Sequence, residues 1–390
     1  GPDYLDGITA DVVFRTPGMH PDIPALRQLR EAGASVTSEM EVFFEVCPCK
    51  IIAVTGSDGK TTTTTLIAEI LKHAGRRVWL GGNIGTPLLP VAEKMEPDDI
   101  AVVELSSFQL MGMTRSADVA VVTNLAPNHL DVHKDMAEYI AAKQNVYLHQ
   151  SRTGKLVVNM DNAITDSFAE SAPGTVEKFS RLGRPERGVW LNGDTIYRND
   201  TPIMKAADIR IPGVHNIENY MAAACAVEGL AADADIDAVA KSFPGVEHRI
   251  EFVRELDGVK YYNDSIASSP SRTIAGLHSF HQKVILIAGG YDKHIPFDVL
   301  GPEVCAHVKA LVLCGATAAK IRAAVESAPG YKAGTPDILE AHTLAEAVKL
   351  ARSTAKPGDI VTLSPACAAF DQFKNFAVRG NTYKQLVNAL

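Results

Sequence analysis

The sequence predicts an α/β fold with mostly parallel sheets, and three observations lead to this prediction. Short apolar runs alternate with stretches of helical periodicity along most of the chain, as in repeated strand–helix–strand units. The runs form two series, with a break in the pattern near residues 244–247. At about 100–200 residues per domain, 390 residues with 46% hydrophobic content suffice for two or three domains. We therefore expect the remnant of an N-terminal Rossmann-like domain at 1–47, a central domain at 48–245 and a C-terminal Rossmann-like domain at 246–390.

The overall composition limits the kinds of partner. A net charge of −8 argues against nucleic acid. No apolar run approaches the roughly 18 residues of a membrane-spanning helix, and the start of the chain lacks the charged-then-apolar pattern of a secretion signal. The six cysteines are scattered without zinc or redox spacing, which favours reduced thiols. We expect a cytoplasmic monomer that acts on small molecules and binds no membrane.

The N-terminal region begins with a short strand at 11–14, followed by the turn Thr16-Pro17-Gly18 and an amphipathic helix at 23–32. No partner strand precedes residue 11, so we expect that an upstream segment is missing from this sequence. Thr16 and Gly18 follow the end of a strand, where α/β sheets bind ligands. A plain turn explains these two residues equally well.

The best-defined motif is the segment 51–67, in which a buried strand, a glycine-containing turn and a helix follow one another. Glycines let backbone N–H groups approach phosphate oxygens, and the start of the helix adds partial positive charge. A lysine can then reach the β and γ oxygens, and a threonine hydroxyl can bind Mg²⁺. The fit to the general P-loop pattern is imperfect, because Val54 stands where the first glycine belongs. The predicted ATP-phosphate site consists of Gly56, Ser57, Asp58, Gly59, Lys60, Thr61 and Thr62.

Two further strand ends carry polar side chains. The strand at 78–80 leads to Gly81-Gly82-Asn83, where paired glycines allow close approach of a ligand and Asn83 offers a donor and an acceptor. The strand at 100–104 ends in Glu104, which is placed beside the predicted phosphate loop to bind Mg²⁺ directly or through water. The plainer alternative for Glu104 is a surface carboxylate.

The next strand, at 119–123, is followed by His129, again beyond a carboxyl end where ligands bind. We expect a helix over 136–149, and it carries Lys143 among alanines and apolar residues. A partly buried amine at this position would have a lowered pKa and would be reactive. The alternative is an ordinary solvated lysine on a helix.

Residues 155–231 complete the central domain. A strand is expected at 155–160, and Asn192-Gly193-Asp194 predicts a hairpin turn within a small antiparallel extension. A long helix is expected over 217–231, with Asn216 as its N-cap and Asn219 in its first turn. Capping alone would explain Asn216.

The second series of strands is expected at 259–263, 284–288, 310–314 and 359–363. Two of its strand ends carry residues suited to chemistry. Asn263-Asp264-Ser265 follows the first strand of the series, and Ser364-Pro365-Ala366-Cys367 follows the last. In a parallel sheet these ends lie at the edge where ligands bind.

Taken together, nine segments in this order resemble the Mur ligases: TGSDGKTT, GGNIG, ELSSFQL, NHLDVH, AAK, GVHNIEN, EHRIE, YNDS and LSPACAAFDQFKNFAVRG. The resemblance covers essentially the whole chain. Its last segment resembles the members that add D-glutamate, rather than those that add L-alanine, diaminopimelate, lysine or the terminal dipeptide. The resemblance implies three domains: one for a UDP-sugar, a central ATPase and one for an amino acid. It further implies an ATP-dependent amide ligase that joins D-glutamate to UDP-N-acetylmuramoyl-L-alanine through an acyl phosphate, in cytoplasmic peptidoglycan synthesis and hence in cell shape and division.

The resemblance also implies roles for single residues. Lys60 and its loop would bind the ATP phosphates, Thr61 and Glu104 one Mg²⁺, and His129 with a carbamylated Lys143 a second Mg²⁺. The nucleotide contacts would also include Asn216, Asn219, Arg249 and Asp264. The candidate substrate contacts are Thr16, Gly18, Asn83 and His129 for the UDP-sugar, and Ser268, Lys293 and Phe376 for D-glutamate.

Two positions depart from the commoner pattern of the family. Ile266 stands where a lysine is usual, and Ala369 stands where a serine is usual, so both changes affect the amino-acid site. Three alternatives stay open: another Mur-type ligase, a folylpolyglutamate synthase, and a P-loop switch protein that binds nucleotide without making a product.

Overall fold

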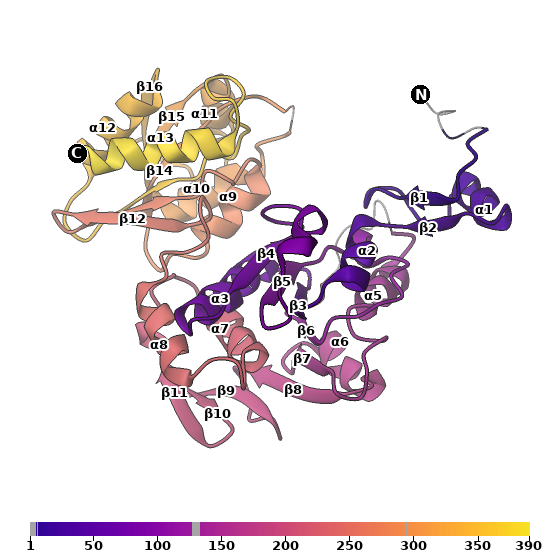
Figure 1. The fold of residues 1–390 in the computed structure, drawn as a ribbon. Helices are drawn as coiled ribbons and strands as arrows, with labels where there is room; N and C mark the ends of the chain where they lie inside the picture. The colour runs from indigo at the N-terminus through magenta and orange to yellow at the C-terminus, as the bar shows by residue number, and fades with distance from the viewer. Residues whose placement is uncertain (1–4, 6, 127–132, 294) are drawn as a thin grey trace. The chain divides into compact units, whose positions relative to one another are not determined.

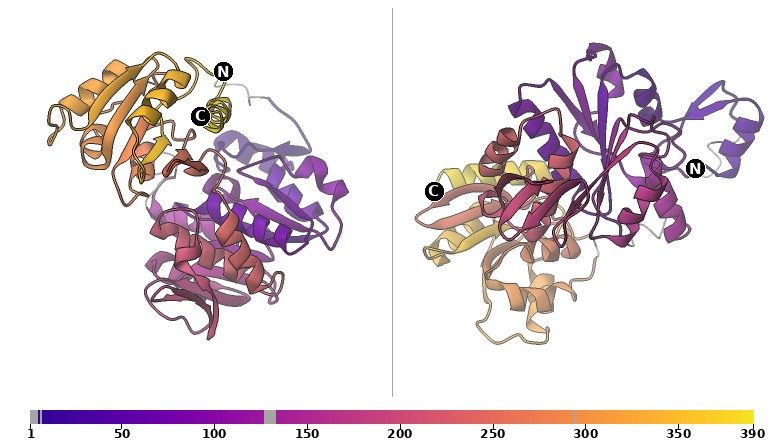
Figure 2. Two further views of the ribbon diagram at one scale, coloured as in Figure 1. Left: turned by 90° about the vertical axis from the view of Figure 1, so that its left-hand side faces the viewer. Right: turned by 90° about the horizontal axis from the view of Figure 1, so that it is seen from below.

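The chain folds into two compact α/β units, which confirms the predicted fold class (Figures 1 and 2). The structure is a computed structural model, and it describes residues 5, 7–126, 133–293 and 295–390. Unit 1 comprises Gly1–Ile209 and His215–Ser242, and unit 2 comprises Arg210–Val214 and Phe243–Leu390.

Unit 1 is built on a large sheet that is mostly parallel. Within the described residues this sheet has nine strands in the order β11-β10-β9-β8-β7-β6-β3-β5-β4, and only the pairs β9/β10 and β10/β11 are antiparallel. The strands are β3 (Lys50–Thr55), β4 (Val78–Gly82), β5 (Ile100–Glu104), β6 (Val119–Val122), β7 (Lys155–Asn159), β8 (Thr175–Ser180), β9 (Gly188–Asn192), β10 (Thr195–Arg198) and β11 (Thr201–Lys205). The predicted hairpin at 192–194 joins β9 to β10.

Helices lie on this sheet, and a small N-terminal layer adjoins it (Figure 1). The layer pairs β1 (Val12–Phe14) with β2 (Ser35–Thr37) in parallel across helix α1 (Pro24–Glu31). The remaining helices of this unit are α2 (Glu39–Val46), α3 (Lys60–His73), η1 (Leu89–Lys94), α4 (Ser107–Leu110), α5 (Met136–Gln144), α6 (Ala163–Ser167), η2 (Phe168–Ser171), η3 (Ala206–Asp208), α7 (Val214–Ala226) and α8 (Asp233–Ser242).

The central strands of unit 1 have continuously apolar sequences because both faces of each strand are buried. From Ile51 to Thr55 every residue of β3 is buried, and β5 and β6 are buried along their whole lengths. Strands with helices on both faces bury both sets of side chains. The pairing aligns Val54 of β3 with Glu104 of β5, and Thr55 of β3 with Val122 of β6. Three strands therefore end at the same level of one sheet edge.

Unit 2 is a second sheet covered by helices on both faces. Its described strands run in the order β12-β13-β17-β14-β15-β16, and only β12/β13 is antiparallel. The strands are β12 (Glu251–Leu256), β13 (Val259–Asn263), β14 (Val284–Ala288), β15 (Val308–Cys314), β16 (Asp337–Ala341) and β17 (Ile360–Leu363). The helices are α9 (Pro270–Leu277), α10 (Leu300–His307), α11 (Ala318–Glu326), α12 (Leu344–Thr354) and α13 (Phe376–Asn388).

Successive side chains of β14 pack alternately into the two hydrophobic cores of unit 2. Leu286 packs in the core that includes side chains of α9, α10 and α11, whereas Ile285 and Ile287 pack in the core with α12 and α13. A strand places successive side chains on opposite faces, so one apolar run supplies both cores.

Two of the predicted helices have different bounds in the structure, and strands β2, β12 and β16 were not predicted. The helix expected over 136–149 ends at Gln144, and turns follow it. The helix expected over 217–231 is α7, which begins at Val214 and ends at Ala226, before Gly229 in the left-handed conformation. Asn216 is thus the third residue of a helix, and its assignment as N-cap was wrong. Strands β12 and β16 went unpredicted because their sequences mix polar and apolar residues.

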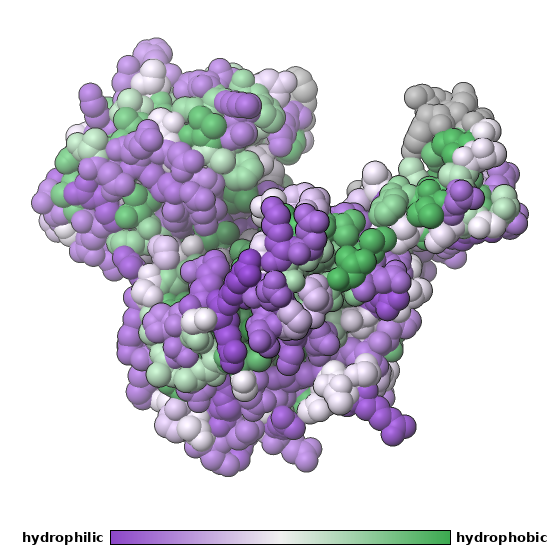
Figure 3. All heavy atoms as spheres, in the orientation of Figure 1, coloured by the Kyte–Doolittle hydropathy of each residue, from purple (hydrophilic) through white to green (hydrophobic). Residues whose placement is uncertain are grey.

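The surface is of mixed polarity. Figure 3 shows hydrophilic residues over much of one face, with hydrophobic residues gathered over α2, where Val46 is 51% exposed. None of the described helices is both long enough and apolar enough to cross a membrane. All six cysteines are free thiols.

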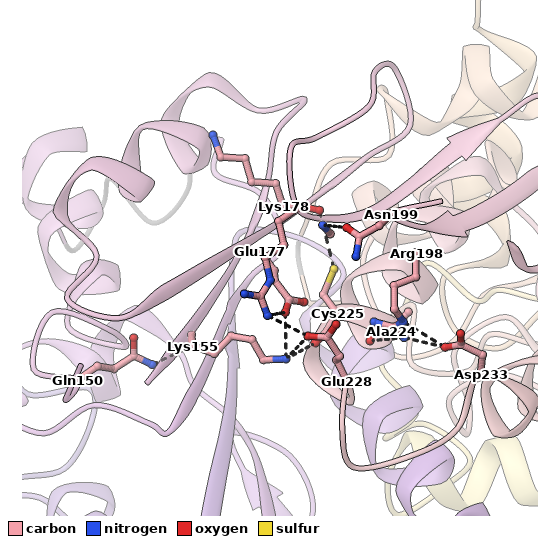
Figure 4. Close-up of polar contacts among 12 residues, drawn as sticks. Gln150, Lys155, Glu177, Lys178, Arg198, Asn199, Ala224, Cys225, Glu228 and Asp233 are labelled. Carbon is pink, nitrogen blue, oxygen red and sulfur yellow. Dashed lines mark hydrogen bonds and ion pairs between the residues drawn. The ribbon is translucent and has the colours of Figure 1, made fainter. Parts of the chain in front are cut away.

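A charged cluster lies between the sheet and the end of α7 in unit 1 (Figure 4). Glu177 of β8 is 1% exposed, and its Oε2 atom has no hydrogen-bond partner among the described residues. The Lys155 ammonium is 3.5 Å from Glu177 and 3.6 Å from Glu228, and it donates to the carbonyl of Cys225. Burial raises the pKa of Glu177 to about 7, whereas hydrogen bonding with Glu177 and the nearby cations lower the pKa of Glu228 to about 2. The cluster therefore carries a proton at weakly acidic pH.

We predict that Glu177→Gln makes unit 1 less sensitive to pH. The pKa of Glu177 is about 7 in the folded protein and 4.5 in the unfolded chain. Between these pH values the folded state keeps a proton that the unfolded state has lost. This contribution is complete below pH 4.5 and is lost as the pH rises through 7. From pH 5 to 7 the wild type should lose on the order of 2 kcal/mol of unfolding free energy relative to the variant.

The measurement is urea unfolding followed by tryptophan fluorescence, because both tryptophans, Trp79 and Trp190, lie in unit 1. Glu186→Gln, which removes the charge of an exposed glutamate nearby, is the matched control and should keep the pH dependence of the wild type. Parallel pH profiles for wild type and Glu177→Gln would contradict the prediction.

Candidate active site

The turn between β3 and α3 is pressed against its neighbours at two glycines. Gly56 has φ +149°, and a Cβ atom there would lie 2.0 Å from the Oγ1 of Thr123 at the end of β6. Gly59 has φ +77°, and a Cβ atom there would lie 2.4 Å from the Oδ1 of Asn219 in α7. Both positions therefore require glycine for space as well as for backbone conformation.

The middle of the turn is held by residues that sequence reasoning missed. The N–H of Ser57 donates to the carbonyl of Asn124, and the N–H of Asp58 donates to its side-chain oxygen, at 2.8 and 3.0 Å. The Ser57 hydroxyl lies 3.0 Å from the Tyr139 hydroxyl of α5 and donates to the carbonyl of Ala126. The N–H groups of Ser57 and Asp58 and the hydroxyl of Ser57 thus form hydrogen bonds within the protein. These bonds fix the shape of the turn.

The start of α3 supplies donors of the kind that bind phosphate. The first N–H groups of a helix have no acceptor inside the helix, and here they belong to Lys60, Thr61 and Thr62. The Lys60 ammonium lies over the turn and donates to the carbonyls of Gly56 and Ser57 at 2.9 and 2.8 Å. Lys60 and Thr61 are half-buried. An anion at this helix end would meet N–H groups, an ammonium and a hydroxyl together.

Glu104 lies at the same sheet edge, inside the protein. Its side chain is 1% exposed, which excludes a surface carboxylate. Oε1 accepts from the Asn83 side chain at 2.7 Å, and the Asn83 N–H donates to the Glu104 carbonyl at 2.8 Å. Oε2 is buried without a hydrogen-bond partner among the described residues. A buried carboxylate oxygen with an open lone pair is a ligand that Mg²⁺ prefers.

Lys143 is buried, as expected for a reactive amine and not for an ordinary solvated lysine. Its side chain is 1% exposed, and its ammonium nitrogen lies 2.9 Å from the Oγ1 of Thr55, the last residue of β3. The same nitrogen lies over the ring of Tyr139, 5.1 Å from its centroid. Burial, and secondarily the charge of Lys60, lower the pKa of Lys143 well below its ordinary value. The buried environment therefore favours the uncharged amine.

Asn216 and Asn219 are brought to the turn by α7. Both are buried, and the Asn219 side chain donates to the Asn216 oxygen at 3.0 Å. The Oδ1 of Asn219 accepts from the hydroxyl of Thr63 in α3 at 3.1 Å. A pocket of about 70 Å³ lies beside them, lined by Asp58, Gly59, Thr123, Asn124, Phe179, His215, Glu218 and Asn219. Asn219 thus packs against Gly59 of the turn between β3 and α3 (the predicted phosphate turn) and lines the pocket, and Asn216 accepts a hydrogen bond from its side chain.

The N-terminal turn is tied to the segment that follows Glu104. Thr16 and Gly18 are exposed. Arg15, which is 7% exposed, donates to the carbonyls of Met19 at 2.8 Å and of Met111, just beyond α4, at 2.7 Å. This arginine, which sequence reasoning missed, fixes the turn to unit 1 and leaves Thr16 and Gly18 at its surface.

In unit 2, Asp264 lies at the ends of β13 and β17. It is 4% exposed, and its two oxygens accept from the Ser364 hydroxyl at 2.7 Å and from the Ile250 N–H at 3.3 Å. Burial raises the pKa of Asp264 to about 7, against the opposing effect of these hydrogen bonds. Gly276 of α9 is so close that a Cβ atom there would lie 2.7 Å from the carboxylate.

The other candidate site residues of unit 2 are more exposed to solvent. Lys293 is exposed beyond the end of β14, and Phe376 is 40% exposed at the start of α13, edge-on to His248. Arg249, in the loop before β12, and Ser268, in the loop after β13, are half-buried. Ser268 and Lys293 lie in two separate loops of unit 2, and Phe376 is the first residue of α13. The expected role of His129 lies outside the described residues.

The comparisons with known proteins agree with this geometry. The Mur ligase middle-domain model matches residues 54–227, and the Mur ligase glutamate ligase domain model matches residues 248–367. A UDP-N-acetylmuramoylalanine–D-glutamate ligase of Acetivibrio thermocellus is 56% identical over all of this chain and 85% of its own length. This chain belongs to the Mur ligase family.

A second relative of the same name, from Clostridium kluyveri, is 52% identical over all of the chain and 85% of its own length. The fold also matches a solved Mur ligase structure, that of a UDP-N-acetylmuramoyl-L-alanyl-D-glutamate–2,6-diaminopimelate ligase, with a TM-score of 0.66. That match covers 99% of this chain and 98% of the other at 18% identity. At that identity the likeness concerns the fold alone.

We predict that Gly59→Ala weakens ATP binding to this Mur ligase at least about tenfold, because the new methyl group would displace Asn219 from the turn. Gly75→Ala is the matched control. Gly75 follows the same helix with nearly the same φ, +78°, and has no atom within 4 Å of an added Cβ. Both changes carry the backbone strain of a left-handed alanine, about 1 kcal/mol.

Titration with a non-hydrolysable ATP analogue, together with urea unfolding, measures both effects. Gly75→Ala should be destabilised but bind the analogue normally. Equal analogue affinity in the two variants would show that contact between Gly59 and Asn219 has no part in nucleotide binding.

Proposed function

We propose that this Mur ligase joins D-glutamate to the carboxyl end of UDP-N-acetylmuramoyl-L-alanine at the expense of ATP, a step of peptidoglycan precursor synthesis in the cytoplasm. The observation that carries the proposal is the sequence identity of 56% and 52%, over the whole chain, to two proteins named UDP-N-acetylmuramoylalanine–D-glutamate ligase. The phosphate turn, Glu104 and Lys143 at one sheet edge are what an ATP-dependent ligase needs.

The chemistry joins an acid to an amine, which requires that the acid be activated. A carboxylate oxygen of the UDP-sugar substrate attacks the γ-phosphorus of ATP, and ADP leaves, which gives an acyl phosphate. The amine of D-glutamate then attacks the acyl carbon; phosphate leaves, the nitrogen loses a proton and an amide remains. Two anions must meet in the first step, so Lys60 and the N–H groups at the start of α3 serve by electrostatic stabilisation and positioning.

Two Mg²⁺ sites belong to the proposal. Thr61 and Glu104 would hold the first ion, and the unpartnered Oε2 of Glu104 fits this role because a carboxylate oxygen is a hard ligand. His129 and a carbamylated Lys143 would hold the second. A bound Mg²⁺ would supply positive charge against the phosphate oxygens.

Carbamylation of Lys143 fits its surroundings. A neutral amine adds CO₂ at its nitrogen, releases one proton and becomes a carbamate with one negative charge. Burial favours the neutral amine that this addition needs, and Thr55 holds its nitrogen in place. The product offers oxygen ligands where the lysine offered none, which suits Mg²⁺.

Further features of the proposal follow the sequence expectations. Residues 1–47, 48–245 and 246–390 would bind the UDP-sugar, ATP and the amino acid respectively. Thr16, Gly18, Asn83 and His129 would contact the UDP-sugar; Asn216, Asn219, Arg249 and Asp264 the nucleotide; and Ser268, Lys293 and Phe376 the D-glutamate. We expect a monomer that binds neither nucleic acid nor membranes.

The test of the proposed function is phosphate release from ATP. Release should require both UDP-N-acetylmuramoyl-L-alanine and D-glutamate, and Lys60→Ala should abolish it while the far-UV circular dichroism spectrum stays unchanged. Release with a folate substrate, or with another amino acid in place of D-glutamate, would indicate a different ligase. ATP hydrolysis that depends on neither substrate would indicate a nucleotide switch.

We predict that Lys143→Ala lowers kcat on the order of 10²–10³-fold, the usual cost of losing one group that stabilises developing charge. A short-chain carboxylate such as acetate should partly restore activity by replacing the carbamate. Lys143→Met removes the same amine but leaves a smaller cavity than alanine does. Lys134→Ala, at an exposed lysine before α5, is the matched control.

Labelling with ¹³C-bicarbonate should give a carbamate NMR signal in the wild type and in Lys134→Ala, and none in either Lys143 variant. An active wild-type enzyme without that signal would rule out the carbamate.

We also predict that Lys293→Ala raises the KM for D-glutamate about 10- to 100-fold, since a hydrogen bond to a charged group contributes roughly 1.5–3 kcal/mol. The KM for ATP should not change. Lys293 is the cation we assign to the side-chain carboxylate, because Ile266 and Ala369 remove two polar groups usual in the family. Lys332→Ala, at another exposed lysine of unit 2, is the control.

Competition among D-glutamate, D-aspartate, L-glutamate and glycine checks this assignment. The wild type should prefer D-glutamate, and the preference over glycine should shrink in Lys293→Ala. An equal kcat/KM for glycine in the wild type would mean that the site does not recognise the side-chain carboxylate.

A further inference from the structure

A cluster of three metal-binding side chains lies on unit 2, in residues that the ligase chemistry does not use. His278 follows the last turn of α9, and Glu303 and His307 lie on α10. Each side chain offers one ligand atom, and these atoms all lie within 4.8 Å of one another. Helices α9 and α10 are neighbours in the structure (Figure 1).

The sequence explains how the three side chains meet. Glu303 and His307 are four residues apart on one helix, so they lie on the same face. Leu277, next to His278, packs in the same core as Leu300 and Val304 of α10. This packing brings the end of α9 against the polar face of α10.

The distances suit a single small ion. The Nε2 of His278 lies 2.6 Å and the Nε2 of His307 lies 3.5 Å from the same oxygen, Oε2 of Glu303. Two ligands that each lie about 2.1 Å from a tetrahedral zinc ion are roughly 3.4 Å apart. Side-chain shifts of roughly an ångström would therefore bring the three ligand atoms around one ion. Exposures of 52%, 32% and 35% for His278, Glu303 and His307 leave the cluster open to solvent.

We propose that His278, Glu303 and His307 form a binding site for a transition-metal dication of the Zn²⁺ class, with water as the fourth ligand. Two imidazoles and one carboxylate are the donors that Zn²⁺, Ni²⁺, Co²⁺ and Cu²⁺ select, whereas Mg²⁺ and Ca²⁺ prefer sets of oxygens alone. The site is thus chemically distinct from the oxygen-rich site proposed for Mg²⁺ at Glu104.

The bound ion would join two helices of unit 2. Thr273 in the middle of α9 donates to the carbonyl of Ser364 at 3.2 Å and accepts from the N–H of Ala366 at 3.0 Å. The same helix therefore contacts the loop after β17 on one side and carries a ligand of the proposed site at its end. An ion that binds only the folded state also raises its stability by mass action.

The experiment is equilibrium dialysis of the full chain against Zn²⁺ in excess Mg²⁺, with Co²⁺ as a spectroscopic probe. The wild type should bind one Zn²⁺ ion that His278→Ala, His307→Ala and Glu303→Gln each bind at least about tenfold more weakly, since loss of a direct ligand costs no less than loss of its outer-shell partner. Co²⁺ in the wild type should give the intense visible absorption of a four-coordinate site, and the three variants should lack it.

His342→Ala is the matched control, because His342 is an exposed histidine of unit 2 outside the cluster. It should bind Zn²⁺ with the affinity of the wild type. The proposal is overturned if the three cluster variants bind Zn²⁺ as tightly as the wild type, or if His342→Ala weakens binding as much as they do. The cluster would then be a histidine–glutamate ion pair only. The measurement does not depend on ligase activity, so its outcome is independent of the proposed function.

Discussion

Two ionisable side chains are buried at one edge of the large sheet, and the rest of unit 1 depends on holding them there. Glu104 and Lys143 are each 1% exposed, and neither forms an ion pair among the described residues. An uncompensated buried charge costs several kcal/mol. Asn83 lowers this cost for Glu104 by donating to one of its oxygens, and for Lys143 the cost is smaller in the neutral form, which burial favours. Glu104 thus keeps one carboxylate oxygen without a hydrogen-bond partner among the described residues.

The register of three strands makes this arrangement possible. Because Val54 pairs with Glu104 and Thr55 with Val122, the hydroxyl that holds Lys143 and the carboxylate of Glu104 emerge at one level. The phosphate turn follows Thr55 directly and fits against Thr123 only because Gly56 has no side chain. Shape and charge at this site are therefore consequences of one register.

Local sequence patterns predicted the parts of the site that lie at strand ends, and they could not predict the contacts that join those parts. Glu104 and Lys60 follow from an apolar run and a glycine turn, signals confined to a few neighbouring residues. Asn124 holds the turn from 66 positions away, and Tyr139 from 82 positions away, so no local pattern marks them. Asn216 was read as a cap because a lone asparagine before an apolar run is typical of one, whereas α7 begins two residues earlier at Val214. Hydrogen bonds across the fold, such as the one from Arg15 to the carbonyl of Met111, have no local signal either.

Unit 2 contains a buried cation, Arg379, whose donors all point to the protein. Arg379 lies in the segment that resembles the amino-acid site, yet it is 3% exposed. Its guanidinium donates to the carbonyls of Ser265, Cys367 and Ala368 and to the Ser265 hydroxyl, at 2.9–3.0 Å. These bonds join the loop after β13 to the loop after β17, and burial lowers the pKa of Arg379 to about 10 without discharging it at neutral pH. Arg379 therefore joins these two loops, and its guanidinium is occupied by protein oxygens instead of being open to a carboxylate from solution.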